Sequence, residues 1–369
     1  MDRGGIETML MNYYRHLDRD QFQFDFLVNK EKPGFFDDEV RSLGGRIFMG
    51  PGLSPLKYPE YLRYMKTLLD REKEIKVLHA HNEAMEFYAL NGAKKAGFPV
   101  RIAHAHNTHL PHGLKLPVKL VCKAMIPGAA TDYFACGREA GIYYFGEKRW
   151  NESGVLIHNA IDLERFGYRS EVRTRLRREY QLEDKLVVGS VARFMVQKNH
   201  TRMLEQFACL KKIYPNSHLL LAGEGELQAA MEEKAKRLGI YDSVSFLGVQ
   251  KDTSIWYQAM DVFLMPSLFE PCGLSQLMSL RYGTVPIVRE TGGLKDTVEP
   301  YNEYESTGTG FSFTNYNAHE MLGTIYYAEK IYYEKKREWN KIVDRAMAAD
   351  FSWNVSAKKY QEMYDWLIG

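Results

Sequence analysis

The chain has 369 residues, of which 45% are hydrophobic and 26% are charged, and its formal net charge is +2. The length exceeds that of one ordinary domain and predicts two. The near balance of charge gives no reason to expect a nucleic-acid partner, and no run reaches the roughly 18 apolar residues that span a bilayer. The start of the chain shows no apolar run typical of a signal peptide.

Short apolar runs alternate with amphipathic stretches along the whole chain. Strands are predicted at residues 22–28, 46–49, 77–80, 100–105, 132–135, 155–158, 187–192, 218–222, 244–247, 262–266 and 285–288. Helices are predicted between many of them, for example at 200–213 and 227–238. This alternation predicts an α/β protein with parallel sheets, and the strands suffice for two Rossmann-like domains.

An Asn/Asp turn follows the strand at 155–158 and predicts the domain boundary. We expect an N-terminal domain at 1–163, a C-terminal domain at 164–350, and a helical segment at 351–369 that crosses back to the first domain. The glycine turn at Gly4 and Gly5 has no strand before it. The N-terminal sheet is therefore expected to lack its first strand.

Histidines end two of the N-terminal strands. His79 and His81 lie at the end of one predicted strand, and His104 and His106 lie at the end of the next, so alternation places each pair on one face. Such pairs can ligate zinc or iron, but no acidic cluster accompanies them, so no metal is expected. His106 is the candidate for contact with a sugar or its phosphates.

Two cations follow the strand at 187–192. Arg193 and Lys198 lie where an open α/β sheet binds ligands, beyond the carboxyl end of a strand. A guanidinium and an ammonium on one loop can neutralise a diphosphate leaving group. A loop with two solvated cations is the alternative.

Two further turns contribute an acid and backbone donors. Glu270 follows the strand at 262–266, where a carboxylate could hold sugar hydroxyls or complement a helix dipole. The N–H groups that begin the next helices could bind an anion. These donors belong to Gly273, Leu274, Thr291, Gly292 and Gly293.

Two further glycine turns follow the predicted strands at 218–222 and 244–247. Gly223 belongs to a fragment of G-x-G-x-x-G that lacks its third glycine and is weak evidence alone. Gly248 follows the strand at 244–247 and could border a nucleobase through backbone contacts.

Residues 4–265 resemble the family 4 retaining glycosyltransferases of the capsular and exopolysaccharide type. The resemblance rests on the segments at 3–8, 104–107, 158–162, 191–194, 198–200 and 223–225. From about residue 269 the chain instead resembles bacterial glycogen and starch synthases, through the segments at 270–274, 281–284, 291–294, 308–311 and 313–316. The chain thus resembles a splice of two related families.

One position departs from the family 4 pattern. A second glutamate commonly stands eight residues after the first, but Met278 stands there in this chain. Glycogen synthases also lack that glutamate.

The resemblance implies a GT-B fold with two facing Rossmann-like domains and a cleft between them. It implies metal-independent transfer of a sugar from a nucleoside diphosphate to a glycan or lipid-linked acceptor, with retained configuration and without a cofactor. An α-glucan glucosyltransferase that uses ADP- or UDP-glucose is the alternative within this class. An epimerase, an inactive nucleotide-sugar binder and a metal hydrolase are the alternatives outside it. We expect a cytoplasmic location, with peripheral association with the inner face of the membrane as an open possibility.

Overall fold

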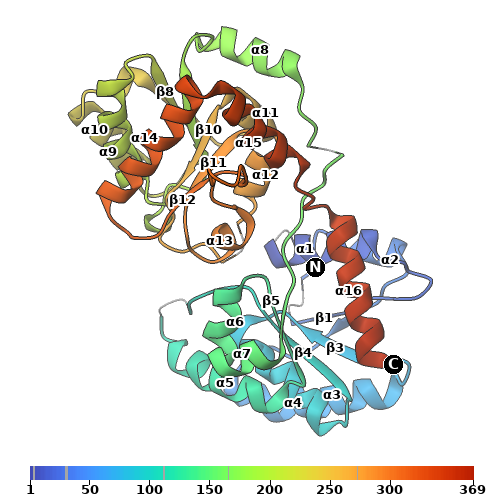
Figure 1. The fold of residues 1–369 in the computed structure, drawn as a ribbon. Coiled ribbons are helices and arrows are strands. Elements are labelled where there is room, and N and C mark those ends of the chain that lie inside the picture. Colours follow the sequence, from blue (N-terminus) through green and yellow to red (C-terminus); the bar gives the residue numbers. More distant parts are fainter. Residues whose placement is uncertain (3–4, 30–31, 111–112, 165, 272) are drawn as a thin grey trace. The chain divides into compact units, whose positions relative to one another are not determined.

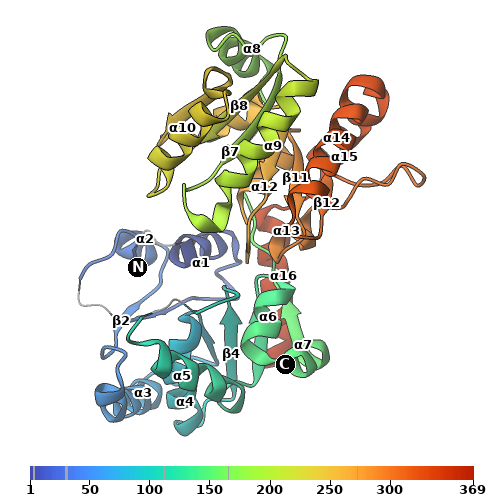
Figure 2. The ribbon, with the colours of Figure 1, turned by 90° about the vertical axis from the view of Figure 1, so that its left-hand side faces the viewer.

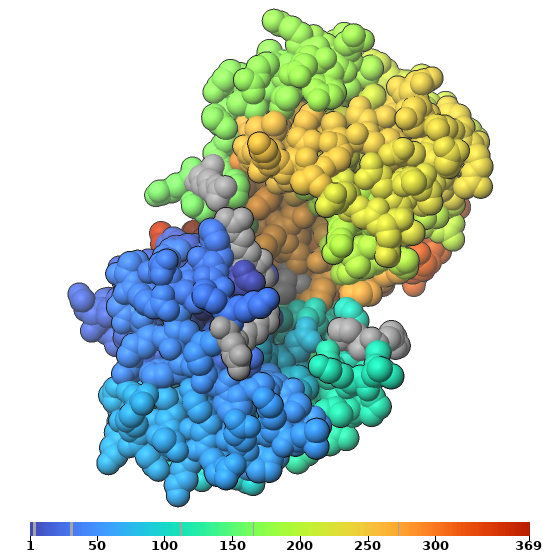
Figure 3. Space-filling model, turned by 180° about the vertical axis from the view of Figure 1, so that it is seen from behind, coloured from blue at the N-terminus to red at the C-terminus, as the bar shows by residue number. Residues whose placement is uncertain are grey.

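The computed structural model describes the chain except residues 3–4, 30–31, 111–112, 165 and 272 (Figure 1). It divides the chain into two compact units, Met1–Asn159 with Ser352–Gly369, and Ala160–Phe351. The sequence prediction drew its boundaries at 163/164 and 350/351, and it likewise assigned the last helix to the first domain. Figure 3 shows both units in space-filling form, coloured by sequence.

The strands of the N-terminal unit form two sheets that are both parallel. The smaller sheet pairs β1 (Phe26–Val28) with β2 (Ile47–Met49). The larger has the order β3 (Val77–Ala80), β4 (Val100–Ala105), β5 (Asp132–Ala135) and β6 (Gly154–Leu156). No strand precedes β1 in the part of the chain that is described, and the expectation of a lacking first strand stays a prediction.

Helices surround these strands (Figure 2). They are α1 (Gly5–His16), α2 (Asp37–Ser42), η1 (Pro55–Lys57), α3 (Tyr58–Arg71), η2 (Glu83–Glu86), α4 (Phe87–Lys95), α5 (Leu116–Ala129), α6 (Arg138–Phe145), α7 (Glu147–Ser153) and α16 (Trp353–Ile368). The last helix packs against the first, because Tyr360 of α16 stacks on Tyr13 of α1 at 4.0 Å between ring centroids. The two ends of the unit are therefore joined.

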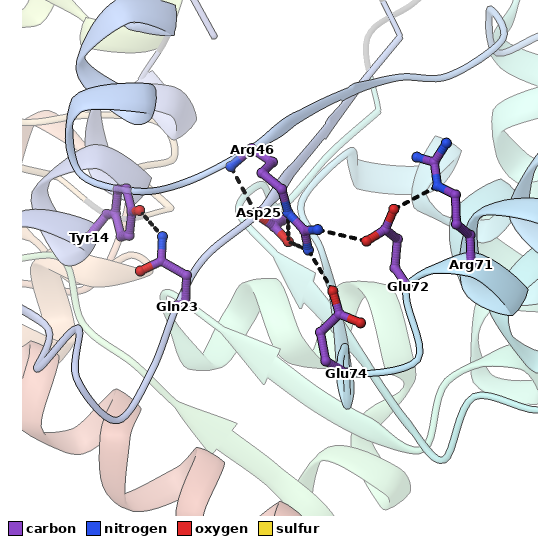
Figure 4. Close-up of polar contacts among 7 residues, drawn as sticks. All are labelled: Tyr14, Gln23, Asp25, Arg46, Arg71, Glu72 and Glu74. Atoms are coloured by element: carbon purple, nitrogen blue, oxygen red, sulfur yellow. Dashed lines mark hydrogen bonds and ion pairs between the residues drawn. The ribbon is translucent and has the colours of Figure 1, made fainter.

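A cluster of ion pairs connects the smaller sheet to the segment after α3 (Figure 4). Arg46 precedes β2, and its guanidinium contacts the carboxylates of Asp25, Glu72 and Glu74 at 2.5, 2.6 and 3.1 Å. These acids hold the pKa of Arg46 above its ordinary value, chiefly through the hydrogen bonds of Asp25. One residue thus joins three segments that are distant in sequence.

The C-terminal unit is a doubly wound sheet. Its parallel strands have the order β12 (Phe311–Phe313), β11 (Val285–Arg289), β10 (Val262–Met265), β7 (Leu186–Val191), β8 (Ser217–Ala222) and β9 (Val244–Gly248). Successive residues face opposite sides, so that Leu186 and Val188 belong to one apolar cluster and Val187 to another. Both faces of the sheet are therefore buried.

Helices cover those two faces. The first face carries α9 (His200–Ile213), α10 (Gln228–Arg237), α14 (Ala318–Glu334) and α15 (Lys336–Ala348). The second carries α8 (Ser170–Glu179), α11 (Ser254–Ala259), α12 (Ser275–Arg281) and α13 (Gly293–Thr297). Two short turns, η3 (Val196–Lys198) and η4 (Tyr241–Ser243), complete the unit.

The predicted strands all appear, and β3, β4 and β5 have the predicted bounds. The prediction missed β12, a three-residue strand at the sheet edge. The described residues contain no helix that is both long enough and apolar enough to cross a membrane.

Candidate active site

The loop after β7 carries the two predicted cations. Because β7 lies near the middle of a parallel sheet, this loop lies at the edge where all the carboxyl ends of the strands meet. Arg193 is exposed, and its guanidinium has no ion-pair or hydrogen-bond partner among the described residues. Lys198 ends the short turn η3, just before α9. The guanidinium of Arg193 is therefore free to bind an anion.

Lys198 pairs with Glu270, the predicted acid. The ammonium contacts Oε2 of Glu270, and the hydroxyl of Ser267 donates to the same oxygen at 3.4 Å. Glu270 is buried, with 8% of its surface exposed. The structure thus brings together a cation and an acid that are 72 residues apart.

Backbone contacts hold the two loops against each other. The N–H of Leu268 donates to the carbonyl of Gln197 at 2.8 Å, and the Gln197 amide donates to the carbonyl of Phe269 at 2.9 Å. Asn199, which adopts a left-handed conformation at φ 57°, donates to the carbonyl of Pro266 at 3.2 Å. The sequence did not predict that Gln197 and Asn199 connect the two loops. The only indication in the sequence was that Asn adopts the left-handed conformation more readily than most residues.

The glycine turn after β11 lies against the Glu270 loop. Gly292 has φ 47°, and a Cβ there would lie 2.3 Å from the carbonyl oxygen of Glu270. Only glycine allows this approach. The N–H of Gly293 donates to the same carbonyl at 2.9 Å, so this N–H is already used in the structure. Thr291 beside them is buried.

Some predicted backbone donors remain unused. The N–H groups of Gly273, Leu274 and Gly292 have no acceptor among the residues that the structure describes. Gly273 has φ 59° and precedes α12, whose N-cap is Leu274. Met278 of α12 packs on apolar residues of both adjoining clusters. The turn thus offers free donors to an anion, and Met278 serves packing.

Gly223 and Gly248 lie on neighbouring strands at the same edge. Ala222 pairs with Gly248, and the N–H of Gly223 donates to the Gly248 carbonyl at 2.8 Å. A Cβ on Gly223 would lie 2.2 Å from the Ala192 oxygen. This glycine is required for the close packing of the β7 and β8 loops, whether or not a ligand contacts it.

Four histidines of the N-terminal unit, His79, His81, His104 and His106, form one stack. Rings within each H-x-H pair lie 4.2 and 4.3 Å apart, as the alternation predicted. Nitrogens of His79 and His104 are 3.0 Å apart, and those of His81 and His106 are also 3.0 Å apart. Figure 1 shows β3 and β4, which carry them, side by side in the larger sheet.

Burial keeps these imidazoles neutral. It lowers the pKa of His106 to about 4, and burial together with His106 lowers the pKa of His79 to about 3. Burial first, and neighbouring histidines second, also holds the pKa values of His81 and His104 well below the ordinary value. Neutral imidazoles can donate to or accept from a sugar hydroxyl.

The same stack has the donor set of a metal site. His79, His81 and His104 each offer a nitrogen within 4.8 Å of the others, and neutral imidazole suits zinc and other transition ions. Ring nitrogens of two of these histidines already have partners, because the hydroxyl of Tyr364 lies 2.7 Å from Nδ1 of His79 and that of Tyr360 lies 3.2 Å from Nδ1 of His104. The absence of a metal remains an expectation.

Acids next to the histidines were missed by sequence reasoning, which saw no carboxylate pair. Glu83 has a positive φ of 51°, which is uncommon for a residue other than glycine, and accepts a hydrogen bond from the Asn107 amide. Glu86 is fully buried, and burial holds its pKa well above the ordinary value. The only sequence signal was their place shortly after the strand at 77–80, which carries His79.

The remaining predicted residues belong to the glycine turn at the start of the chain. Gly4 lies outside the described residues. Gly5 begins α1, and a Cβ there would meet no atom within 4 Å. Packing within this unit therefore does not require glycine at position 5.

The parallel sheets of the N-terminal unit and the doubly wound sheet of the C-terminal unit form the fold of a GT-B glycosyltransferase. Comparison with known proteins agrees. The family model for glycosyltransferase family 4 matches residues 3–165, and that for glycosyl transferases group 1 matches 172–344. A crystal structure of Anabaena Alr3699/HepE in complex with UDP is similar, with a TM-score of 0.77, 18% identity, and coverage of 98% of this chain and 96% of that one.

One relative shows the family, and a second matches a shorter part of the chain. The putative glycosyltransferase EpsF of Bacillus subtilis is 35% identical over 275 residues, which are 73% of this chain and 72% of EpsF. The glycogen synthase of Lachnospira eligens is 80% identical over 109 residues, which are 30% of this chain and only 23% of that synthase. The chain belongs to the glycosyltransferases of family 4 and group 1, with glycogen synthase-like features.

Proposed function

We propose that this protein transfers a sugar from a nucleoside diphosphate sugar to a glycan or lipid-linked acceptor in polysaccharide biosynthesis, with retained configuration and without a metal. The observation that supports this most is the C-terminal loop cluster. There an unpaired guanidinium, a lysine–glutamate pair and free backbone N–H groups occupy one edge of one sheet.

Each of these groups fits one part of such a donor. Arg193 and Lys198 would neutralise the diphosphate as it leaves, which is where charge develops in the transition state. The N–H groups of Gly273, Leu274 and Gly292 would hold phosphate oxygens. Glu270 would accept hydrogen bonds from hydroxyls of the donor sugar. The UDP bound in the similar HepE structure favours uridine as the base.

The N-terminal unit would supply the acceptor side. His106 directly follows β4 and belongs to the histidine stack; it would contact the sugar or phosphate, with Gly5 beside the phosphate. The similarity to the putative glycosyltransferase EpsF, which covers most of both chains, supports a glycosyltransferase activity. The acceptor of the exopolysaccharide kind rests on the resemblance of residues 4–265.

An α-glucan glucosyltransferase is the second candidate. It is favoured by the 80% identity with a glycogen synthase over 109 residues. In that case the donor would be ADP- or UDP-glucose and the acceptor a glucan chain.

Replacement of Arg193 tests the proposal. We expect Arg193→Ala to lower kcat for release of nucleoside diphosphate from UDP-glucose or ADP-glucose by about 10²–10³-fold, because a charge that acts in the transition state is lost. Arg202→Ala is the control, since Arg202 is a helix residue that pairs with Glu205. A near-normal rate in Arg193→Ala would contradict the role of Arg193 in stabilising the leaving diphosphate. No turnover in the wild-type chain would favour an inactive nucleotide-sugar binder.

A further inference from the structure

Helix α5 of the N-terminal unit exposes an apolar stripe. Its solvent-facing positions are Pro117, Leu120, Val121, Ala124, Met125 and Gly128. Val121 is 60% exposed, Leu120 50% and Met125 48%, and Leu114 just before the helix is completely exposed. The spacing of three and four residues puts the stripe on one side of the helix.

The opposite side of α5 is already covered. Cys122, Ile126 and Ala129 are buried, and the helix packs on α4, α6 and η2. Figures 1 and 2 both show α5 beside α4 at the surface of this unit. A surface helix ordinarily turns a polar face to water, so an apolar exposed face marks an interaction surface.

The charge around the stripe is positive. Residues 87–131 contain no Asp or Glu and include the six cations Lys94, Lys95, Arg101, Lys115, Lys119 and Lys123. Some of them have partners, because Lys123 lies 3.6 Å over the Tyr143 ring and Lys94 donates to a backbone carbonyl. The ammonium groups of Lys115 and Lys119 have no partner among the described residues.

We propose that α5 and Leu114 form a docking face for an anionic lipid bilayer, with the apolar stripe at the level of the headgroups and Lys115 and Lys119 on the lipid phosphates. A helix of 14 residues is about 21 Å long, too short to cross a hydrocarbon core of about 30 Å. It has the combination of apolar face and flanking lysines that holds interfacial helices to membranes. Such a face would bring the enzyme to a lipid-linked acceptor.

Sedimentation with lipid vesicles tests this face. The wild-type protein is expected to sediment with phosphatidylcholine vesicles that contain phosphatidylglycerol, and weakly with phosphatidylcholine alone. Val121→Glu/Met125→Glu should lower the partition by about tenfold or more, since both apolar side chains would then carry charge. Lys115→Gln/Lys119→Gln should lower it by roughly fivefold for each charge, and only with phosphatidylglycerol present.

The matched control replaces exposed apolar residues of the C-terminal unit. Ile213→Glu/Leu238→Glu should bind vesicles like the wild type, because these residues lie at the ends of α9 and α10. Circular dichroism should give Val121→Glu/Met125→Glu an unchanged melting curve, since both positions are exposed.

Three outcomes would overturn the proposal. The wild-type chain could fail to bind either vesicle, or Val121→Glu/Met125→Glu could bind as well as the wild type. Light scattering could instead show an oligomer that Val121→Glu/Met125→Glu dissociates, which would assign the face to a second copy of this chain. Vesicle binding requires no sugar donor, whereas the proposed transferase activity is tested by nucleotide binding. A failure of one proposal can therefore be distinguished from a failure of the other.

Discussion

At the scale of single residues, the pairing of Lys198 with Glu270 sets the chemistry of the proposed donor site. Both side chains are largely buried, so each would be costly to leave without its partner. A bound diphosphate would compete for the ammonium of Lys198. Glu270 would then be released toward the sugar, which connects arrival of the leaving group with recognition of the donor.

The buried histidines make the N-terminal unit sensitive to acid. Their pKa values are lowered by burial, to about 4 for His106 and about 3 for His79. Between pH 6.5 and those values the unfolded chain binds protons that the folded chain does not. Stability should therefore fall with decreasing pH, by up to about 1.4 kcal/mol per pH unit for each histidine.

Urea unfolding at pH 7, 6 and 5 measures this slope. His79→Asn should reduce the slope, because one of the protonating groups is removed. His319→Asn, at an exposed position of α14, should leave it unchanged. Equal slopes in the wild type and His79→Asn would contradict the histidine origin of the effect.

At the scale of elements, the strands were predicted from the sequence more accurately than the loops. The strands at 77–80, 100–105 and 132–135 were predicted with their observed bounds, because apolar runs of that length between polar turns are too short for a typical helix and fit a buried parallel strand. β12 was missed because its two phenylalanines flank a single serine, and an alternation that short predicts no strand by itself.

Arg46 should stabilise the N-terminal unit through its contacts between elements. Arg46→Ala would leave the mostly buried Asp25 without its cation and would leave Glu72 with Arg71 alone. Because Arg46 itself is 45% exposed, solvent screens the effect, and we expect the melting temperature to fall by roughly 2–4 °C.

Arg41→Ala is the matched control for Arg46. Its ion pair with Asp38 is exposed on both sides, so its loss should not change the melting temperature measurably. Differential scanning fluorimetry distinguishes the two variants. Equal melting curves would mean that the Arg46 cluster contributes nothing to stability.

Helix α16 should be needed for the stability of the N-terminal unit and not for that of the C-terminal unit. It buries Trp353, Ala357, Tyr360 and Tyr364, and Trp353 packs edge-on against Tyr13 of α1. A chain that ends at Phe351 should lose or strongly lower the melting transition of the first unit and keep that of the second. Scanning calorimetry would resolve the two transitions.

Trp366→Ala serves as the control for that truncation. Trp366 is 70% exposed at the end of the same helix, so its replacement should leave both transitions in place. An unchanged first transition after truncation would mean that α16 is not part of the N-terminal unit.

At the scale of the whole molecule, the sequence predicted which strand ends carry the residues of the proposed site, but not how their loops are built. Arg193, Lys198 and Glu270 could be found because each follows a recognisable strand. Gln197 and Asn199 could not, because their roles depend on carbonyls about 70 residues away. Contacts between loops of different strands leave no local pattern in the sequence.

We propose that the C-terminal unit binds a nucleoside diphosphate without a metal. Titration calorimetry of the full chain with UDP and with ADP, in metal-free buffer and again with EDTA, tests it most directly. We expect micromolar binding of one nucleotide, unaffected by EDTA and much weaker in Arg193→Ala. No binding of either nucleotide, or binding that EDTA abolishes, would contradict the account.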